Sequence, residues 1–479
     1  MSDAAAMSMA WPVLIQGGMG IGVSGWPLAR AVSRRGQLGV VSGTGVDSLF
    51  VRRLQDGDLG GHLRRAMERF PMPEVAAAAL REWFVPGGRT PAAPYKLMPM
   101  YQQVMSQARE RLAMLAAFVE VTLAKEGHDG VVGMNLLTKV QMPNLPTLYG
   151  ALLAGVDYVL MGAGIPREIP GALDAMAAGR EAKLRFEVEG DGSDVVEYLR
   201  FDPAGHFPEA APPALKRPRF LAIISSHLLA TVLARKASGH VDGFVVEGPT
   251  AGGHNAPPRE DAPANARGEP VYGARDVVDL ARMRELGRPF WLAGGAGRPE
   301  RVREARAAGA AGVQVGGLFA FCDESGVDPA LRASVVESAA RGEIDVYTDP
   351  QASPTGYPFK VVRWPGDPAL GVERERLCDL GYLRTPYRNP AGGIGYRCAS
   401  EPVETYVKKG GDIADTANRR CLCNTLFATV GHAQVRADGW QEPPLVTGGD
   451  DLKHLSTFLG GRTRYSADDV VDYLVGPRG

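Results

Sequence analysis

The stretch Val245–Asn255, VVEGPTAGGHN, decides the fold that we expect of this sequence. Its β-branched residues indicate a buried parallel strand that ends at Gly248. Gly252 and Gly253 allow the backbone to approach a ligand closely just before the imidazole of His254. His254 is therefore expected at the C-terminal end of a strand, where α/β barrels carry their active sites. The alternative, a loop histidine without a role, holds unless other loops converge on it.

The composition is that of a globular protein with one large domain and an additional one. The chain has 479 residues, of which 45% are hydrophobic and 22% are charged. Lys and Arg number 53 against 54 Asp and Glu, so net charge favours a neutral or small anionic partner over nucleic acid or an anionic membrane. Residues 1–10 lack a basic region, and no apolar run reaches the roughly 18 residues of a membrane span. We expect a cytoplasmic protein.

Eight short apolar segments alternate with helical patterns along the chain, and most of them end at Gly or Ser. This count predicts an α/β fold of the (β/α)8 TIM-barrel type. A doubly wound sheet is the competitor, but its dinucleotide-binding type needs an acidic residue at the end of the second strand, where this chain has Ser42 and Gly43. The expected strands are Val13–Gln16, Leu38–Gly43, Val131–Asn135, Asp157–Met161, Phe220–Ser225, Gly243–Glu247, Phe290–Ala293 and Gly312–Val315.

Two insertions and a tail extend this barrel. Residues 46–127 show helical spacing and no strand signal, so a helical insertion is expected after strand two. Such an insertion either lies over the pocket as a lid or packs against the barrel wall. Residues 181–217 are a polar, Pro-rich excursion with a possible hairpin. The predicted domains are residues 1–365, the cofactor-binding barrel, and residues 366–479, a C-terminal Cys-containing extension.

Gly-rich turns follow three of the expected strands. The turn Gly17–Gly22 after strand one exposes backbone N–H groups to a bound ring or anion. The loops after strands seven and eight, which contain Gly294–Gly297 and Gly316–Gly317, are the usual phosphate cradle of such barrels. Together they imply a phosphorylated planar cofactor.

In combination and order, the motifs resemble those of the nitronate monooxygenases, the 2-nitropropane dioxygenase-like flavoproteins. The resemblance runs from about Pro12 to Phe319. It rests on Ile15–Met19, Gly133–Asn135, Ala251–His254, Ala293–Gly295 and Gly312–Gly316. It implies FMN as the cofactor and His254 as the catalytic histidine. The residues that the resemblance and the loops assign to the cofactor are Gly17, Gly18, Met19, Asn135, Glu247, Gly252, Gly253, Ala293, Gly294, Gly295, Gly316 and Gly317, with the phosphate on the last four glycines.

The resemblance implies an FMN-dependent oxidoreductase that oxidises alkyl nitronates, or a related small acidic carbon substrate, with O₂. In the family mechanism the anionic nitronate passes an electron to the flavin and O₂ then inserts oxygen at carbon, whereas a neutral nitroalkane first loses its α-proton to the histidine. One departure is Glu247, where family members commonly carry Gln. A carboxylate there disfavours the reduced, anionic flavin unless it is paired or neutral.

Two alternatives stay open for the function. The first is a trans-acting enoyl reductase of a polyketide or fatty acid synthase, which belongs to the same superfamily and takes a reductant and an acyl carrier protein as partners. The second is a non-catalytic flavin-binding partner module. The sequence leaves the electron donor and the oligomeric state undetermined.

Four cysteines lie in the C-terminal extension: Cys378, Cys398, Cys421 and Cys423. Four thiolates suffice for a tetrahedral zinc or an iron–sulfur cluster, and we expect the four to converge. Only Cys421 and Cys423 are close in sequence, so buried cysteines without a metal are the alternative. Arg384, Arg397, Arg419 and Arg420 are expected to lower the thiol pKa values. Cys322 stands apart and is expected to be a packing residue.

Overall fold

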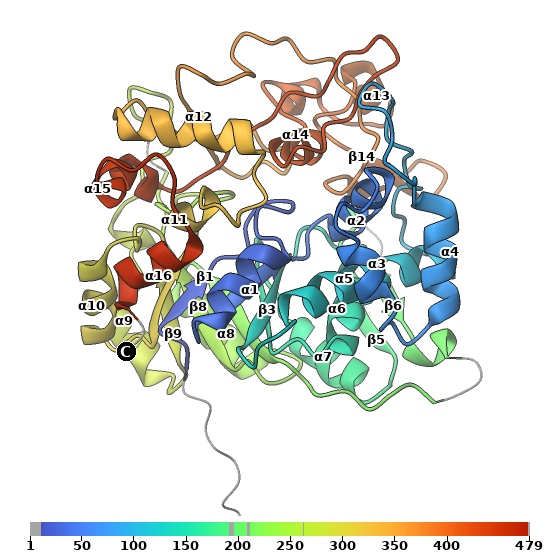
Figure 1. The fold of residues 1–479 in the computed structure, drawn as a ribbon, viewed down its shortest axis with the longest axis horizontal. Coiled ribbons are helices and arrows are strands. Elements are labelled where there is room, and N and C mark those ends of the chain that lie inside the picture. Colours follow the sequence, from blue (N-terminus) through green and yellow to red (C-terminus); the bar gives the residue numbers. More distant parts are fainter. Residues whose placement is uncertain (1–10, 191–195, 208–210, 262, 478–479) are drawn as a thin grey trace, which may run out of the picture.

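Eight parallel strands form a closed barrel in the computed structural model, which describes residues 11–190, 196–207, 211–261 and 263–477 (Figure 1). The hydrogen-bonded order is β1-β10-β9-β8-β7-β4-β3-β2, and a parallel bridge between Ile15 and Leu38 joins the last strand to the first. The (β/α)8 prediction is confirmed, with strand ends that differ from those expected by at most two residues. The strands are β1 (Leu14–Gln16), β2 (Gly39–Ser42), β3 (Val132–Leu137), β4 (Tyr158–Gly162), β7 (Arg219–Ile224), β8 (Gly243–Glu247), β9 (Phe290–Ala293) and β10 (Gly312–Val315).

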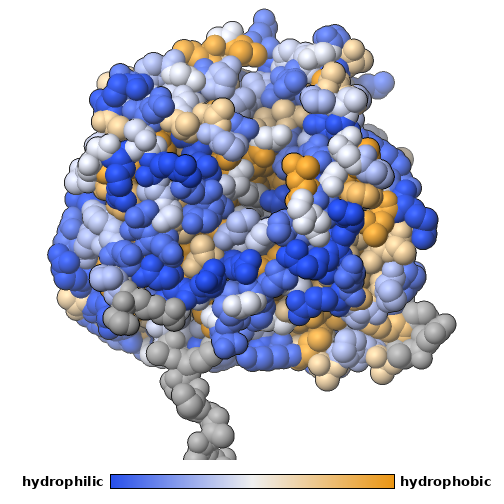
Figure 2. All heavy atoms as spheres, viewed as in Figure 1, coloured by the Kyte–Doolittle hydropathy of each residue, from blue (hydrophilic) through white to orange (hydrophobic). Residues whose placement is uncertain are grey.

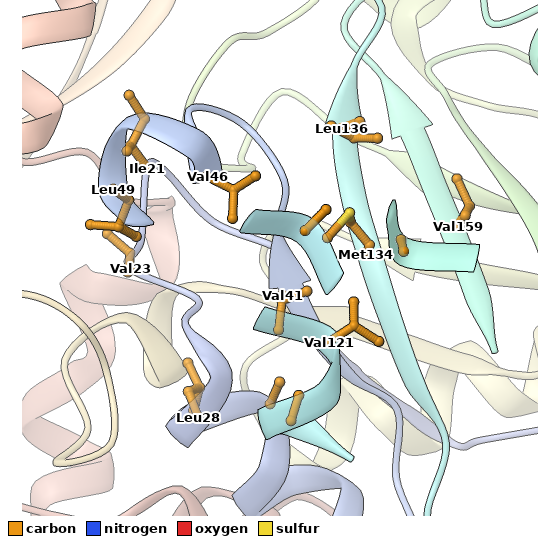
Figure 3. Packing of buried hydrophobic residues seen from close by; sticks show 14 of the residues in the cluster. Ile21, Val23, Leu28, Val41, Val46, Leu49, Val121, Met134, Leu136 and Val159 are labelled. Carbon is orange, nitrogen blue, oxygen red and sulfur yellow. The ribbon is translucent and has the colours of Figure 1, made fainter. Parts of the chain in front are cut away.

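The strands are apolar on both faces because each face has a core of its own. Inside the barrel, Val245 packs in a cluster with Trp291, whose indole N–H donates to the Pro12 carbonyl at 2.8 Å. The alternate residues Phe244 and Val246 belong to a larger cluster between strands and helices. Continuous apolar runs are typical of strands that are buried on both faces. Figure 3 shows this outer packing around β2, β3 and β4.

The helical insertion packs against the barrel wall. It contains α2 (Val46–Gln55), α3 (His62–Met67), α4 (Pro73–Trp83) and α5 (Gln107–Ala124). Helix α5 contacts α1 (Trp26–Arg34) and α6 (Asn144–Leu153), so it takes the outer position that follows β2, and α2, α3 and α4 pack around it. The sequence left open whether the insertion covers the pocket or packs against the barrel wall. Helix α5 packs against the wall. The remaining outer helices are α7 (Ile169–Ala177), α8 (His227–Lys236), α9 (Leu280–Glu285) and α10 (Pro299–Ala307).

The polar excursion forms the hairpin that its sequence allowed. Strand β5 (Ala182–Phe186) pairs antiparallel with β6 (Glu197–Phe201), and the 3-10 helix η1 (Pro203–His206) follows. Residues 191–195 and 208–210 of this predicted excursion lie outside the described residues, as do the N-terminal residues 1–10.

The chain after β10 wraps over the C-terminal ends of the barrel strands and then returns to the wall (Figure 1). Helix α16 (Ala467–Val475) contacts both α1 and α10, and Arg35 forms ion pairs with Asp468 and Asp472 of this helix. Because α11 (Gly317–Ala320) is a single turn, α16 occupies the outer-helix position between α10 and α1.

The division of the chain into two domains at residue 365 stays a prediction. The elements of this part are α11 (Gly317–Ala320), α12 (Pro329–Ala340), β11 (Asp345–Asp349), β12 (Phe359–Arg363), β13 (Thr385–Arg388), β14 (Ile394–Arg397), α13 (Val403–Lys408), α14 (Leu422–Thr429), α15 (Leu455–Leu459) and α16 (Ala467–Val475), with the 3-10 helices η3 (Ile413–Thr416) and η4 (Asp450–His454).

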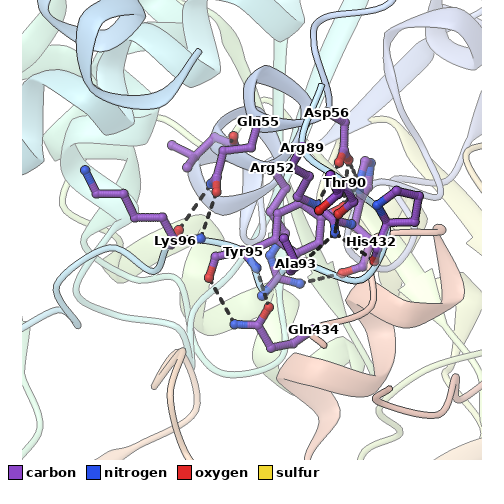
Figure 4. A network of polar contacts seen from close by, with 12 residues as sticks. Arg52, Gln55, Asp56, Arg89, Thr90, Ala93, Tyr95, Lys96, His432 and Gln434 are labelled. Carbon is purple, nitrogen blue, oxygen red and sulfur yellow. Dashed lines mark hydrogen bonds and ion pairs between the residues drawn. The ribbon is translucent and has the colours of Figure 1, made fainter. Parts of the chain in front are cut away.

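Polar contacts fasten the insertion to the extension. The Asp56 carboxylate accepts hydrogen bonds from Tyr95 at 2.6 Å and His432 at 2.9 Å, and it pairs with Arg89 at 3.0 Å. The backbone N–H of Tyr95 donates to the Gln434 side chain at 2.9 Å. Figure 4 shows these side chains converging from helix α2, the loop after α4 and the segment after α14.

A second junction is built on Asp47, which is buried in the first turn of α2. Its carboxylate pairs with Arg109 at 2.5 Å and accepts hydrogen bonds from the hydroxyls of Tyr101 and Tyr382, the latter at 2.6 Å. Burial by itself raises the pKa of Asp47, but the Arg109 charge and the hydroxyl groups outweigh it and hold that pKa below its ordinary value of 3.8. Asp47 thus joins the insertion to the extension in its ionised form.

Figure 2 shows a mostly hydrophilic face on which hydrophobic residues form small separate patches. Within the described residues, no helix is long and apolar enough to cross a membrane.

We predict that Asp47→Ala destabilises the protein by about 3–5 kcal/mol, because it leaves Arg109 as an uncompensated buried charge. The measurement is the free energy of unfolding in urea at pH 7, with Glu82→Ala as the control in the exposed pair with Lys96, expected to cost less than about 1 kcal/mol. The folded pKa of Asp47 lies below the unfolded one, so its contribution is present at neutral pH and is lost as the pH falls below about 4. Equal losses in the two variants would contradict the role assigned to Asp47.

Candidate functional site

A large cavity opens at the C-terminal ends of the barrel strands. Its empty space, with the open mouth included, is about 1530 Å³. The strand-end loops of the barrel form its base, and residues of the extension complete its wall. The residues predicted from the sequence that line it are Gly17, Gly18, Met19, Asn135, Glu247, Gly252, Gly253, His254, Ala293, Gly294, Gly316 and Gly317, whereas Gly295 does not.

The turn after β1 is held from beneath by buried polar groups. Gln16 is fully buried, and its amide donates to Ser24 at 2.8 Å while its carbonyl accepts from the N–H of Val40 at 3.0 Å. The Ser24 hydroxyl donates to the Gly17 carbonyl at 2.8 Å. A Cβ atom on Gly18 would lie 2.3 Å from Asn135, so only glycine lets the two come together.

Two amide oxygens in the cavity lining lack a partner in the part of the chain that the structure describes. They are Asn135 Oδ1 on β3 and Gln314 Oε1 on β10. Buried polar atoms are normally hydrogen-bonded, so such atoms in a cavity wall indicate a ligand with complementary groups. The ring of a flavin carries donors and acceptors along one edge and apolar area on its faces, and the lining fits such a group.

At the predicted phosphate end, the extension contributes a carboxyl group that sequence reasoning missed. Asp451 in η4 accepts a hydrogen bond from the Gly297 N–H at 3.1 Å, close to Gly317. Burial raises the pKa of Asp451 above its ordinary value. A protonated Asp451 is compatible with a phosphate nearby, whereas its carboxylate would repel one.

His254 follows β8 and is held in one orientation by the segment around β12. Its Nε2 lies 2.7 Å from the hydroxyl of Ser353, and its ring packs edge-on against Phe359 with centroids 4.9 Å apart. Burial, and then the charge of Lys139, lower the pKa of His254 to about 3. The imidazole is therefore neutral at physiological pH.

A smaller second cavity shares His254 and Glu247 with the large one and is also lined by Lys139, Arg259 and Tyr357. Burial raises the pKa of Glu247 to about 7. An ionised Glu247 would disfavour a reduced, anionic flavin beside it. The raised pKa makes Glu247 partly protonated near neutral pH and lessens this effect.

Lys139 also lines this cavity, and it was not among the site residues predicted from the sequence. Its ammonium lies over the ring of Tyr357, 2.7 Å from the centroid, and Nζ has no hydrogen-bond partner among the described residues. Burial lowers the pKa of Lys139 to about 7. A buried cation beside a neutral histidine suits a small anion.

We predict that one lysine of the protein titrates near pH 7 and that this lysine is Lys139. After reductive methylation with ¹³C-formaldehyde, one dimethyl-lysine resonance should shift with a midpoint near pH 7 in the NMR spectrum. It should vanish in Lys139→Arg and persist in Lys236→Arg, the control on α8. A resonance that persists in Lys139→Arg would show that another lysine titrates near pH 7.

The four cysteines of the extension line one small cavity, as expected from the sequence. Cys378 and Cys398 act strongly on each other's pKa, as do Cys421 and Cys423. Within the described residues, no group of three or more His, Cys, Asp or Glu side chains is arranged to hold a metal ion. The predicted zinc or iron–sulfur site is thus not supported.

The arginines expected near the thiols act elsewhere. Arg384 donates to the carbonyl of Tyr101, Arg397 pairs with Glu189, and Arg419 donates to the carbonyl of Ser353. The backbone N–H of Arg420 donates to the carbonyl of Ala352 at 2.8 Å. The hydrogen bond from Cys423, and then the charge of Arg374, lower the pKa of Cys421 to about 7. Cys322 lies apart, fully buried, as predicted for a packing residue.

Comparisons with known proteins agree with the resemblance. Residues 207–349 match the family model described as Nitronate monooxygenase, and this segment contains β7 to β10 and the loop with His254. The match confirms the resemblance to that family. The chain is an oxidoreductase, and over residues 207–349, less than a third of its length, it resembles the nitronate monooxygenases.

No curated protein matches the chain. Among solved structures, FabK from Thermotoga maritima is 16% identical with a TM-score of 0.46, over 97% of this chain and 92% of that one. Nitroalkane oxidase from Streptomyces ansochromogenes is 14% identical with a TM-score of 0.44, over 96% and 94%. The enoyl reductase domain of MlnA from Bacillus amyloliquefaciens is 12% identical with a TM-score of 0.45, over 96% and 93%. At these values the likenesses carry no further argument.

Proposed function

We propose that the protein is an FMN-dependent nitronate monooxygenase that oxidises alkyl nitronates, or a related small acidic carbon substrate, with O₂. The observation that carries this proposal is the position of His254 and Glu247, which line both cavities. A cofactor in the large cavity and a substrate in the small one would meet at these two residues.

The second cavity favours a small anion as the substrate. Lys139 and Arg259 both line it, opposed by the carboxyl groups of Glu247 and Asp276. Burial raises the pKa of Glu247 to about 7, and below that pH Lys139 is charged and Glu247 is neutral. Two cations then face one carboxylate, so the local charge is positive. A nitronate carries its negative charge on the oxygens of the nitro group, and it matches this environment without a prior proton transfer.

His254 would have two roles that depend on the substrate. With a nitronate, the neutral imidazole orients the substrate, since its ring is fixed by Ser353 and Phe359. With a neutral nitroalkane, it would accept the α-proton. A conjugate acid with a pKa of about 3 makes a weak base, because general-base catalysis is most efficient when that pKa lies near the working pH. The geometry therefore supports nitronates over nitroalkanes.

FMN would supply one-electron and O₂ chemistry when it is bound. The chain's own residues would hold it: the turn Gly17–Met19 and Asn135 at the ring, and the amides of Gly294, Gly316 and Gly317 at the phosphate. The same proposal includes a cytoplasmic location and no nucleic-acid or membrane partner. The near-balanced charge favours the absence of such partners.

We predict that the purified protein releases FMN and not FAD. The glycine loops after β9 and β10 offer one phosphate site, and the sequence has no second nucleotide-binding fingerprint. Mass spectrometry of the cofactor released by acid decides between the two. Release of FAD, or failure to bind any flavin on reconstitution, would contradict the proposed function.

We predict that His254→Ala keeps the flavin but lowers the turnover of a nitroalkane by about 10²-fold, the low end of the usual loss on removal of a general base, because the low pKa makes His254 a weak base. Turnover of the matching nitronate should fall much less, because that substrate needs no proton transfer. Oxygen consumption with nitroethane and with ethyl nitronate measures both. Reduction of an enoyl thioester by a reduced nicotinamide, without oxidation of either nitro compound, would instead favour the enoyl reductase alternative.

A further inference from the structure

Asp451 of the extension lies between the two glycine loops that we expect to hold the cofactor phosphate. Its Oδ1 accepts a hydrogen bond at 3.1 Å from the N–H of Gly297, in the loop after β9. A Cβ atom on Gly317, which follows β10, would lie 3.3 Å from the Cβ atom of Asp451. The side chain is buried and lines the large cavity. The carboxyl group is therefore part of the wall at the phosphate end.

The backbone around η4 holds Asp451 in this position. The N–H of Asp450 donates to the carbonyl of Thr250, in the loop after β8, at 2.9 Å. A Cβ atom on Gly449 would lie 2.9 Å from the same carbonyl oxygen, so the two backbones are in direct contact. The segment cannot move away from the glycine loops without breaking these contacts.

No cation is paired with this carboxyl group. Among the described residues Asp451 forms no ion pair, whereas its neighbour Asp450 pairs with Lys360 at 3.0 Å. Burial raises the pKa of Asp451 above its ordinary value, although the Gly297 N–H and the charge of Arg298 oppose this shift. A buried carboxylate without a paired cation is costly, and a second anion beside it adds to the cost.

The glycine loops by themselves favour an anion, because backbone N–H groups that point into one space bind phosphate. Asp451 takes one of these N–H groups, that of Gly297, and brings an acidic group to the same place. A phosphate monoester carries about −1.5 to −2 charges at pH 7. Like charges repel more strongly in a buried site than in water. Asp451 thus acts against the group that the loops attract.

We propose that Asp451 determines the cofactor specificity of the large cavity: its carboxylate opposes the phosphate of FMN, so the cavity distinguishes FMN from riboflavin less than its glycine loops alone would. This inference rests on the proposed function, because it takes those loops as the phosphate site. Asp451 is a specificity-determining residue and not a catalytic one, since the reacting groups would meet at His254 and Glu247.

The experiment measures the binding of flavins to the full-length protein after its own flavin has been removed by dialysis. FMN and riboflavin are titrated separately at pH 8, which favours the ionised carboxyl group, and the quenching of flavin fluorescence gives each Kd. Riboflavin has the same ring and ribityl chain without the phosphate. The ratio of the two constants therefore isolates the contribution of the phosphate.

Asp451→Asn is the informative variant, because an amide oxygen still accepts the Gly297 N–H while the charge is removed. We expect the Kd of FMN to fall at least about tenfold, as the loss of a buried like charge predicts, and the Kd of riboflavin to stay unchanged. The control is Asp468→Asn on α16, which removes an exposed carboxylate paired with Arg35 and should change neither constant. A smaller gain for FMN, or an equal change for both flavins, would overturn the role of Asp451.

The outcomes separate this role from the proposed function. FMN bound equally well by the parent and by Asp451→Asn contradicts only the role of Asp451, whereas a parent that binds neither flavin contradicts the proposed function as well. Should Asp451→Asn fail to fold, as judged by its melting temperature, the parent decides. A preference of the parent for FMN below about tenfold supports the proposal, and a larger preference overturns it.

Discussion

The buried carboxylate of Asp47 is the contact on which the packing of the extension against the insertion depends. It lies one turn after the end of β2, and it holds Arg109 at the start of α5 and Tyr382 of the extension. Removing two charges from water costs several kcal/mol each, and the cost is offset only when geometry and further hydrogen bonds are good. The two tyrosine hydroxyls supply those bonds. Because Tyr382 also lines the large cavity, this ion pair fixes part of the cavity wall.

The loop that carries His254 is likewise defined by distant segments. The Gly253 N–H donates to Thr447 at 3.0 Å, and the Lys360 N–H donates to the Gly253 carbonyl at 2.9 Å. A Cβ atom on Gly252 would lie 2.7 Å from the backbone of Gly448, so this glycine is needed for the loop to pack under the extension. Side chains that must hold a ring within a few tenths of an ångström need such support.

The barrel could be predicted from the sequence because each strand has a local pattern of its own. Each strand is a short apolar run that ends at a small residue, and β9 and β10 agree with expectation at both ends. The motif glycines and His254 could be placed for the same reason, since they follow strand ends. Lys139 and Ser353 could not, because neither belongs to a motif and their meeting with His254 depends on tertiary packing. The role of α16 as an outer barrel helix was equally hidden, since nothing in its sequence says which helices it contacts.

The cavity wall draws on both ends of the chain, and this affects how the protein is made. Strand β1 pairs with β10, and the segment Thr447–Asp451 arrives later still during synthesis. Contacts between residues so far apart in sequence form slowly, because the closure of long loops must precede them. A ribosome-bound chain therefore presents an open barrel mouth until its last residues emerge. Enclosure of a cofactor is an event of the completed polypeptide, and a prematurely ended chain would expose the glycine loops to solvent.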